Sequence, residues 1–303
     1  MKKEYLSQLK QYIAQKNILL NEPMSRHTSF KTGGNCELMV LAKSEQDIIN
    51  IIKLTKRYNE KLYVLGNCTN LIVRDKGVKG TILKISKGFD GIVVEDNKLT
   101  AKAGTLLSKL AKVAQQNGLA GLEFASGIPG TVGGAVSMNA GAYGGEIKDI
   151  LAYTKFIDEE GNISQINNME HEFTYRKSVF FNNNNIIVES GFLLKKGEKS
   201  DIQEKMNNYN KKRKQKQPLQ FPSAGSVFKR PLGYYTGQLI EQCNLKGYNI
   251  NGAMISSLHA GFIINENNAT SEDIIGLIAH IQETVYNKYN VRLETEVKII
   301  GEI

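Results

Sequence analysis

The chain has 303 residues, of which 41% are hydrophobic and 23% charged, as in globular proteins with substantial cores. Its length predicts two or three folded units. No apolar run approaches the roughly 18 residues that a membrane-spanning helix requires, and the first residues lack the apolar stretch of a secretory signal. Cys36, Cys68 and Cys243 form no Cys-x-x-Cys pair, which fits reduced thiols. We therefore expect a cytoplasmic protein that does not associate with membranes.

The net charge of +9 comes largely from one segment. Lysine or arginine occupies five of the six positions from Lys211 to Lys216. We favour a solvated helix end as the interpretation of this run, with an anionic small substrate as the alternative. Nucleic acid is disfavoured because no pattern of basic and aromatic residues for base stacking accompanies the run.

Apolar periodicity and turn residues predict the elements of the first half of the chain. They are a helix around Leu6–Ile13, a helix that starts at Ser44, a buried strand at 62–65, strands at 71–73 and 81–85, a hairpin over 91–103 that turns at Asp96-Asn97, and a helix over 105–117 that ends at Gly118.

The second half is predicted in the same way, with a polar helix between two groups of strands. Its elements are antiparallel strands at 151–157, 163–166 and 186–194, a helix over 200–216, a helix near 237–245, strands at 252–255 and 261–264, a helix capped by Thr270 that runs to Lys288, and a final strand over 291–300.

The segment Gly127–Gly145 has seven glycines and almost no charge. Glycines at this density serve special backbone angles or close approach to a ligand, and exposed backbone N–H groups can hold phosphate oxygens. Neither G-x-G-x-x-G after a strand nor G-x-x-x-x-G-K-[ST] is present, so the Rossmann and P-loop motifs are excluded. A second polar turn, Gly66–Asn70, follows a predicted strand. Two such turns could hold a dinucleotide diphosphate from both sides, although each could also be an ordinary tight turn.

Metal and hydrolase motifs are missing from the sequence. The four histidines are far apart and none stands in H-E-x-x-H, so no metal site is expected. Ser226 lies in a turn marked by Gly225 and Pro231, where its hydroxyl could satisfy the backbone or donate a proton. Neither G-x-S-x-G nor S-x-x-K surrounds it, which disfavours a nucleophile.

Other polar residues carry little information when each is considered alone. Lys229 and Arg230 follow Ser226 and would suit phosphate oxygens. Glu296 lies on the polar face of the predicted final strand, where a solvated side chain is the favoured interpretation. Arg176 in Tyr175-Arg-Lys-Ser178 is similarly uninformative by itself.

Together these segments closely resemble the bacterial UDP-N-acetylenolpyruvylglucosamine reductases. The resemblance rests on four motifs in order: G-I-P-G-T-V-G-G-A-V-x-M-N-A-G-A-Y-G-G-E, Y-R-x-S, P-S-A-G-S-V-F-K and L-E-x-E-V. It implies an α+β protein with an FAD-binding fold of the vanillyl-alcohol-oxidase (PCMH) type and a C-terminal α/β substrate-binding domain. The implied ranges are a lead-in at 1–24, the FAD-binding domain at 25–198 and the substrate-binding domain at 199–303.

The resemblance also assigns roles to residues. Ser226 corresponds to the family's proton donor, and Arg176 and Glu296 correspond to the residues that polarise the substrate. Tyr175, Lys229 and Arg230 are expected to bind substrate. The residues expected to contact FAD are Gly66, Asn67, Thr69, Asn70, Gly127, Ile128, Pro129, Gly130, Thr131, Gly133, Gly134, Asn139, Gly141 and Ala142.

The implied reaction is reduction of UDP-N-acetylglucosamine enolpyruvate by NADPH in peptidoglycan precursor synthesis. Hydride adds to the enolpyruvyl double bond, Arg176 and a protonated Glu296 stabilise the enolate, and Ser226 supplies the proton. We expect a monomer without a nucleic-acid partner, in the subclass that lacks a tyrosine-bearing lid loop. A flavin oxidase of the same fold and a basic nucleotide- or nucleic-acid-binding module without chemistry are the alternatives.

Three positions depart from the family pattern. Cys68 stands where members commonly have glycine, and Arg230 and Gly261 stand where asparagine is frequent. The change at Arg230 puts substrate contacts in doubt, but none of the three alters the catalytic residues.

Overall fold

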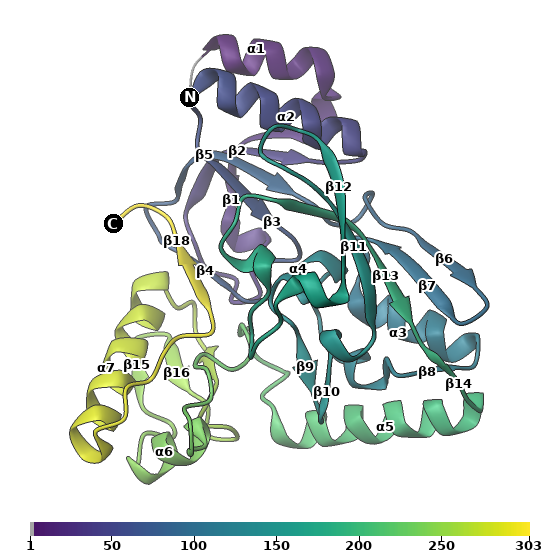
Figure 1. Ribbon diagram of the computed structural model, residues 1–303. Helices are drawn as coiled ribbons and strands as arrows, with labels where there is room; N and C mark the ends of the chain where they lie inside the picture. Colours follow the sequence, from purple (N-terminus) through teal and green to yellow (C-terminus); the bar gives the residue numbers. More distant parts are fainter. Residues whose placement is uncertain (1–2) are drawn as a thin grey trace. The chain divides into compact units, whose positions relative to one another are not determined.

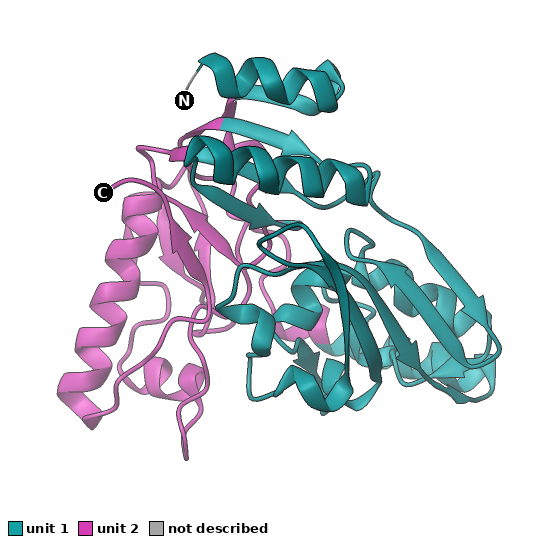
Figure 2. Ribbon diagram, turned by 45° about the horizontal axis from the view of Figure 1, so that its top comes forward, with its two compact units in different colours: residues 1–20, 38–67, 80–212 teal, residues 21–37, 68–79, 213–303 magenta. Residues whose placement is uncertain are grey.

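The computed structural model describes residues 3–303, which form two compact units that alternate along the chain (Figure 2). Unit 1 comprises the described residues up to Leu20 together with Leu38–Asn67 and Gly80–Lys212, and unit 2 comprises Asn21–Glu37, Cys68–Lys79 and Arg213–Ile303. Each unit has its own hydrophobic core. The contiguous ranges 1–24, 25–198 and 199–303 predicted from the sequence stay a prediction.

Most helices belong to unit 1, whose elements are labelled in Figure 1. They are α1 (Lys3–Tyr12), α2 (Glu45–Tyr58), α3 (Leu107–Gln116), α4 (Val132–Ser137) and α5 (Lys199–Lys216), the last continuing past Lys212 into unit 2. A five-stranded antiparallel sheet has the order β12-β11-β13-β7-β6, built from Ile163–Asn167, Leu151–Ile157, Ile186–Leu193, Lys98–Lys102 and Ile92–Glu95.

Three smaller sheets contain residues of unit 1. A four-stranded sheet has the order β1-β2-β5-β3, with strands Ile18–Pro23, Asn35–Leu41, Val78–Lys84 and Leu62–Leu65. Two short pairs complete the set: β10 (Gly145–Glu146) with β9 (Gly141–Ala142), and β14 (Lys195–Lys196) with β8 (Leu119–Ala120).

Local capping residues account for the correctly predicted helices. The Ser44 hydroxyl accepts a hydrogen bond from the Asp47 amide at 3.1 Å and so starts α2, as expected for an N-cap serine. Gly118 follows α3 with φ +66°, the left-handed conformation that glycine adopts without steric cost after a helix. The predicted helices over 105–117 and from Ser44 are therefore confirmed.

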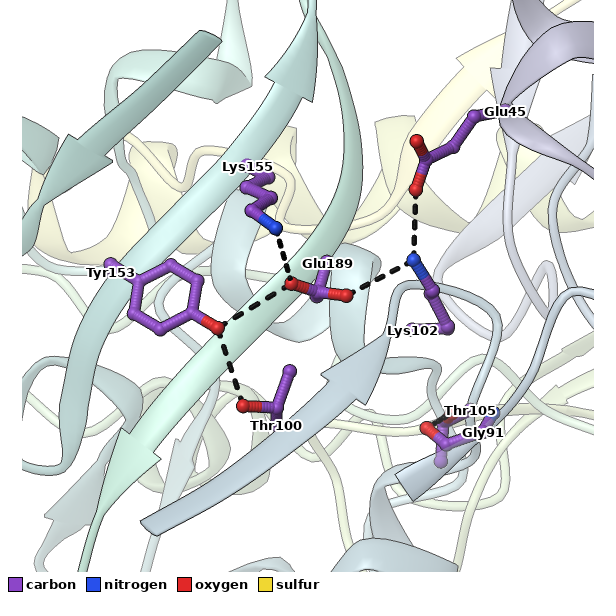
Figure 3. Close-up of polar contacts among 8 residues, drawn as sticks. All are labelled: Glu45, Gly91, Thr100, Lys102, Thr105, Tyr153, Lys155 and Glu189. Atoms are coloured by element: carbon purple, nitrogen blue, oxygen red, sulfur yellow. Dashed lines mark hydrogen bonds and ion pairs between the residues drawn. The ribbon is translucent and has the colours of Figure 1, made fainter. Parts of the chain in front are cut away.

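A row of alternating charges crosses the five-stranded sheet (Figure 3). Lys155 on β11 and Lys102 on β7 stand directly opposite Glu189 on the central strand β13, with ion-pair distances of 3.2 and 3.0 Å. Glu45 at the start of α2 accepts from Lys102 at 2.8 Å. Burial opposes ionisation of Glu189, but hydrogen bonds from the two lysines outweigh it, so the pKa of this carboxyl lies below its usual value.

Replacing Glu189 with glutamine is expected to lower the free energy of unfolding by about 1–3 kcal/mol, because Lys155 and Lys102 lose the charged acceptor that they share, although Lys102 keeps its ion pair with Glu45. Urea unfolding at neutral pH measures this change. Glu160→Gln is the matched control, since Glu160 pairs with Lys56 in the same unit but both side chains are well exposed. Its expected cost is under about 1 kcal/mol. Equal losses in the two variants would contradict the stabilising role of the row.

Unit 2 is built around one long helix and a small sheet. Its elements are β4 (Leu71–Val73), α6 (Thr236–Gln242), β15 (Asn249–Ile250), β16 (Ala253–Ile255), β17 (Ile263–Asn265), α7 (Ser271–Tyr289) and β18 (Lys298–Ile300). Helix α7 packs against the antiparallel sheet β15-β16-β17 (Figure 1). Thr270 caps it as predicted, accepting from the Asp273 amide at 3.1 Å while Asp273 accepts from Thr270 N.

The structure corrects two expectations about elements and adds one element that was not predicted. The final strand over 291–300 is regular only as β18, Lys298–Ile300, which pairs in parallel with β4. Strand β3 is only partly buried, so the prediction of a buried strand at 62–65 was wrong about its environment. The glycine-rich segment contains the short helix α4, which its composition did not predict.

His171 in unit 1 is fully buried, and its hydrogen bonds fit a neutral imidazole ring. Its Nδ1 lies 2.8 Å from the carbonyl oxygen of Asn167; because that oxygen can only accept, Nδ1 carries the proton. Nε2 then accepts from the Thr154 hydroxyl at 2.8 Å. Burial lowers the pKa of His171 below the ordinary 6.5.

We expect the protein to lose stability as the pH falls below about 6.5, by at most about 1.4 kcal/mol per pH unit from this residue. The unfolded chain takes up a proton at His171 in that range, whereas the folded protein resists it. Urea unfolding between pH 7.5 and 5.5 measures the slope, and His171→Gln should reduce it. Burial also lowers the pKa of His259, so part of the slope should remain. An unchanged slope in the variant would contradict the prediction.

No helix in residues 3–303 is long and apolar enough to cross a membrane. The same described residues contain no cluster of three or more histidine, cysteine or acidic side chains that could hold a metal ion.

Candidate active site

The glycine-rich segment of unit 1 folds as a turn followed by α4. Thr131 begins this helix, and its hydroxyl accepts from the Gly134 amide at 3.4 Å. The Gly133 amide donates to the Ala103 carbonyl at 2.9 Å, and a Cβ on Gly133 would lie 3.0 Å from the Ala103 Cβ. Glycine at this position therefore lets the segment lie directly against the strand end that precedes α3.

The two turns predicted to hold a diphosphate come together in unit 1. The Asn67 side chain donates to the Pro129 carbonyl at 2.8 Å. A Cβ on Gly66 would lie 2.5 Å from the Thr131 Oγ1, closer than real Cβ contacts allow. Glycine at position 66 permits this approach, because any side chain there would meet the Thr131 hydroxyl.

This arrangement fits a bound dinucleotide. Gly66, Asn67, Gly130 and Gly133 are half-buried, and Gly134 is exposed, so backbone from both turns remains accessible to a ligand. Compact backbone without side chains is the surface that a diphosphate needs for close approach. The residues present therefore suit the diphosphate of FAD.

Asn139 is fully buried, with its side chain engaged by the protein itself. Its Nδ2 donates to Glu146 Oε2 and to the Thr174 carbonyl, both at 3.1 Å, and its Oδ1 accepts from the Lys148 amide at 3.0 Å. The expected contact of Asn139 with FAD stays a prediction. In the structure its side chain holds the segment that precedes Arg176.

Arg176 stands in a tight turn of unit 1. Thr174 and Lys177 exchange backbone hydrogen bonds of 3.0 and 3.3 Å across it, and Arg176 has φ +58°. Its Nη2 donates to the Gly141 carbonyl at 3.1 Å, and its guanidinium lies 5.0 Å from the centre of the Tyr175 ring. The predicted catalytic arginine is therefore held against the glycine-rich segment.

Ser226 lies in unit 2 between two neighbouring backbone segments. It pairs with Phe262 in an antiparallel bridge, and the Val227 amide donates to the Gly261 carbonyl at 3.0 Å. The half-buried hydroxyl donates to the Phe228 carbonyl at 3.2 Å. Rotation about its Cα–Cβ bond would redirect this proton without any movement of the backbone.

Glu296 and Ser226 occupy adjacent backbone segments of the same unit. The Glu296 amide donates to the Val227 carbonyl at 2.7 Å, and paired strands lie about 4.8 Å apart. The Asn70 side chain donates to the Glu296 carbonyl at 3.0 Å. Unit 2 thus brings together two predicted catalytic residues and the end of the predicted FAD turn that begins at Gly66.

The two basic residues after Ser226 have different surroundings. Lys229 forms an ion pair with Glu294 at 3.1 Å, which offsets its charge. Arg230 is exposed; its Nε donates to the Tyr234 carbonyl at 3.2 Å and its guanidinium stacks 3.9 Å from the centre of the Tyr235 ring. Arg230 therefore presents the more accessible cation of the two.

Sequence reasoning gave no role to Ser178, the last residue of Y-R-x-S. Its side chain is buried, and its hydroxyl donates to the Ser137 carbonyl at 2.8 Å, beside a 3.1 Å bond from its own amide to the same oxygen. The motif itself was the only sequence signal that could have marked it.

Comparison with known proteins decides the family. Residues 36–167 match the family of FAD binding domains, and residues 217–300 match the C-terminal domain of UDP-N-acetylenolpyruvoylglucosamine reductase. The reductase of that name from Caldanaerobacter subterraneus subsp. tengcongensis is 46% identical over 98% of both chains. The reductase from Clostridioides difficile is 42% identical over 96% of this chain and 95% of its own.

The chain belongs to the UDP-N-acetylenolpyruvoylglucosamine reductase family. A solved structure agrees: the reductase from Thermus caldophilus has a TM-score of 0.80 and 32% identity, and the match covers 94% of this chain and 98% of that one. The match to an FAD binding domain identifies FAD as the cofactor of this reductase-family protein.

More distant structures share the fold of the FAD-binding part. Alkyldihydroxyacetonephosphate synthase has a TM-score of 0.51 at 13% identity over 65% of this chain and 41% of its own. The 4-ethylphenol oxidase from Gulosibacter chungangensis has a TM-score of 0.50 at 14% identity over 64% and 42%. Together with the mixture of helices and strands, these similarities confirm the predicted α+β fold of the vanillyl-alcohol-oxidase (PCMH) type.

Proposed function

We propose that this protein reduces UDP-N-acetylglucosamine enolpyruvate to UDP-N-acetylmuramate, with FAD as cofactor and NADPH as the hydride source. The observation that carries the proposal is the juxtaposition of Ser226 and Glu296 on paired backbone segments, joined by Asn70 to the end of a predicted FAD turn. Membership in the reductase family supports the same reaction.

FAD, when bound, supplies hydride chemistry that no amino-acid side chain provides. Gly66, Asn67, Pro129 and Thr131 would hold it, because these residues form the contact between the two glycine-containing turns. Their backbone is rigidly tied, which favours a preformed diphosphate site.

The chain's own residues stabilise the negative charge that develops on the substrate and donate one proton to it. Reduction of an enolpyruvyl double bond places negative charge on the carbon next to the carboxylate, and a cation or a hydrogen-bond donor lowers that barrier. Arg176 and a protonated Glu296 suit this role. The Ser226 hydroxyl, which donates to Phe228 O in this structure, supplies the proton that completes the product.

The same proposal covers the remaining partners. A UDP-sugar and NADPH are both anionic. Arg230 in unit 2 is suited to contact the UDP-sugar through its charge, and Tyr175 in unit 1 has a ring suited to stacking. A monomer in the cytoplasm without a nucleic-acid partner is consistent with a nucleotide-sugar reductase of peptidoglycan precursor synthesis.

Absorbance measurements on the purified holoenzyme test the proposal. NADPH should bleach the oxidised flavin spectrum, and addition of the enolpyruvyl nucleotide under anaerobic conditions should restore it with stoichiometric NADPH consumption. Reoxidation by oxygen but not by the enolpyruvyl nucleotide would identify a flavin oxidase instead. A purified protein that neither contains nor takes up flavin would contradict the proposal altogether.

A further inference from the structure

The turn that carries Arg176 is largely exposed and contains a residue with a left-handed backbone. Thr174, Tyr175 and Lys177 are exposed, and Arg176 has a left-handed backbone conformation, which is sterically unfavourable for a non-glycine residue. Such a conformation persists only where the surrounding structure determines it. Neighbouring residues must therefore hold this turn.

Two buried side chains hold the turn, one at each end. Before it, Asn139 donates to the Thr174 carbonyl, which also accepts from the Lys177 amide. After it, Ser178 donates through both its hydroxyl and its amide to the Ser137 carbonyl. Both anchors connect the turn to the end of α4 and the residues that follow.

We propose that Asn139 and Ser178 are positioning residues that fix the Thr174–Lys177 turn and thereby hold Arg176 in place. The inference rests on the proposed function for its catalytic consequence. The Arg176 guanidinium donates to Gly141 O on the same glycine-rich segment. This segment therefore contacts both the turn Gly66–Asn70 and the arginine. Asn139 thus acts through Arg176 rather than through a side-chain contact with FAD.

The variants Ser178→Ala and Asn139→Asp remove the anchors one at a time. Alanine loses the hydroxyl donor. Aspartate tolerates the left-handed conformation (φ +44°) of position 139, but it loses both Nδ2 donors and places a carboxylate against Glu146, so Ser178→Ala is the cleaner of the two variants. Each should slow flavin reoxidation by substrate about 10–100-fold, as expected when a catalytic group is displaced by about an ångström. Flavin reduction by NADPH should stay within about two-fold of wild type, by the same reasoning.

Two matched controls lose comparable bonds elsewhere in unit 1. Ser44→Ala removes the hydroxyl that accepts from the Asp47 amide, and Asn168→Asp removes the donors to the Lys148 and Leu151 carbonyls. Neither bond reaches the Arg176 turn. Both controls should reoxidise flavin at the wild-type rate.

A double-mutant cycle separates positioning from general destabilisation. In an Arg176→Ala background, adding Ser178→Ala should change the reoxidation rate less than about two-fold, because residues acting through one another are strongly non-additive. A full additional loss of about 10–100-fold would overturn the inference.

Hydrogen–deuterium exchange of the FAD-free protein tests the anchoring without catalysis. The Lys177 and Ser178 amides, which donate to Thr174 O and Ser137 O, should exchange faster in the two anchor variants than in wild type or the controls. Unchanged exchange would overturn the inference. A wild-type enzyme that does not reduce the enolpyruvyl nucleotide would contradict the proposed function, while the exchange result still decides the anchoring.

Discussion

Ser226→Ala is expected to lower turnover by about 10²–10⁴-fold, the usual contribution of one positioned proton donor. The loss should fall on flavin reoxidation by the enolpyruvyl nucleotide, because NADPH needs no proton from Ser226 to reduce the flavin. Rapid-mixing absorbance measurements of the two half-reactions show which one has slowed. The variant should fold normally, since the bridge to Phe262 and the bond from Glu296 N to Val227 O use only backbone atoms.

The control for this variant is Ser257→Ala, which removes an exposed hydroxyl in the same unit. It should reoxidise flavin at the wild-type rate. If Ser226→Ala kept turnover within a few-fold of wild type, Ser226 would be a turn hydroxyl for the Phe228 carbonyl, the other role that its sequence context allows.

Local signals predicted the helices because capping depends on residues three or four positions apart. Ser44 with Asp47 and Thr270 with Asp273 are examples, and both caps are present. The missed strands β1 and β2 lack such signals. Strand β1 contains Asn21 in a left-handed conformation and ends at Pro23, features that usually interrupt a strand.

Long-range pairing explains the error at the end of the chain. An alternating pattern predicted one strand over 291–300, but the backbone there bonds to several partners in turn. Gln282 donates to the Leu293 carbonyl, Lys229 N donates to Glu294 O, and Glu296 N donates to Val227 O. Only after these contacts does β18 pair with β4. An alternating pattern predicts which side chains are buried. It does not predict which backbone groups pair with one another in a sheet.

The candidate site was only partly accessible to sequence reasoning. Glycine density marked the segment Gly127–Gly145, and polar residues after a predicted strand marked the turn Gly66–Asn70. The structure shows the two in contact, with Gly66 directly against Thr131. The use of the Asn139 side chain could not be foreseen, because its acceptor at Thr174 lies 35 positions away. From the sequence alone, a polar side chain in a glycine-rich loop can hydrogen-bond equally well to a ligand or to a backbone carbonyl far along the chain. Only the fold decides between the two.

Gly66→Ala is expected to abolish stable FAD binding. The new Cβ would lie 2.5 Å from Thr131 Oγ1, and Thr131 is buried and caps α4, so the threonine cannot move aside freely. The Gly66 turn must then withdraw from the glycine-rich segment, which separates the two turns that we propose hold the diphosphate. The flavin-to-protein absorbance ratio after purification measures the loss.

The cause can be tested by removing the atom that clashes. Thr131→Ala deletes Oγ1, and the Cβ that remains at position 131 lies 3.5 Å from the place of the new methyl group on residue 66, an ordinary contact. The double variant Gly66→Ala/Thr131→Ala should therefore regain flavin, although loss of the α4 cap costs about 1 kcal/mol. Gly91→Ala is the matched control, because its Cβ would meet only Lys102 Cγ at 3.8 Å in the same unit. Full flavin content in Gly66→Ala would show that the close contact between the turns is not needed for FAD binding.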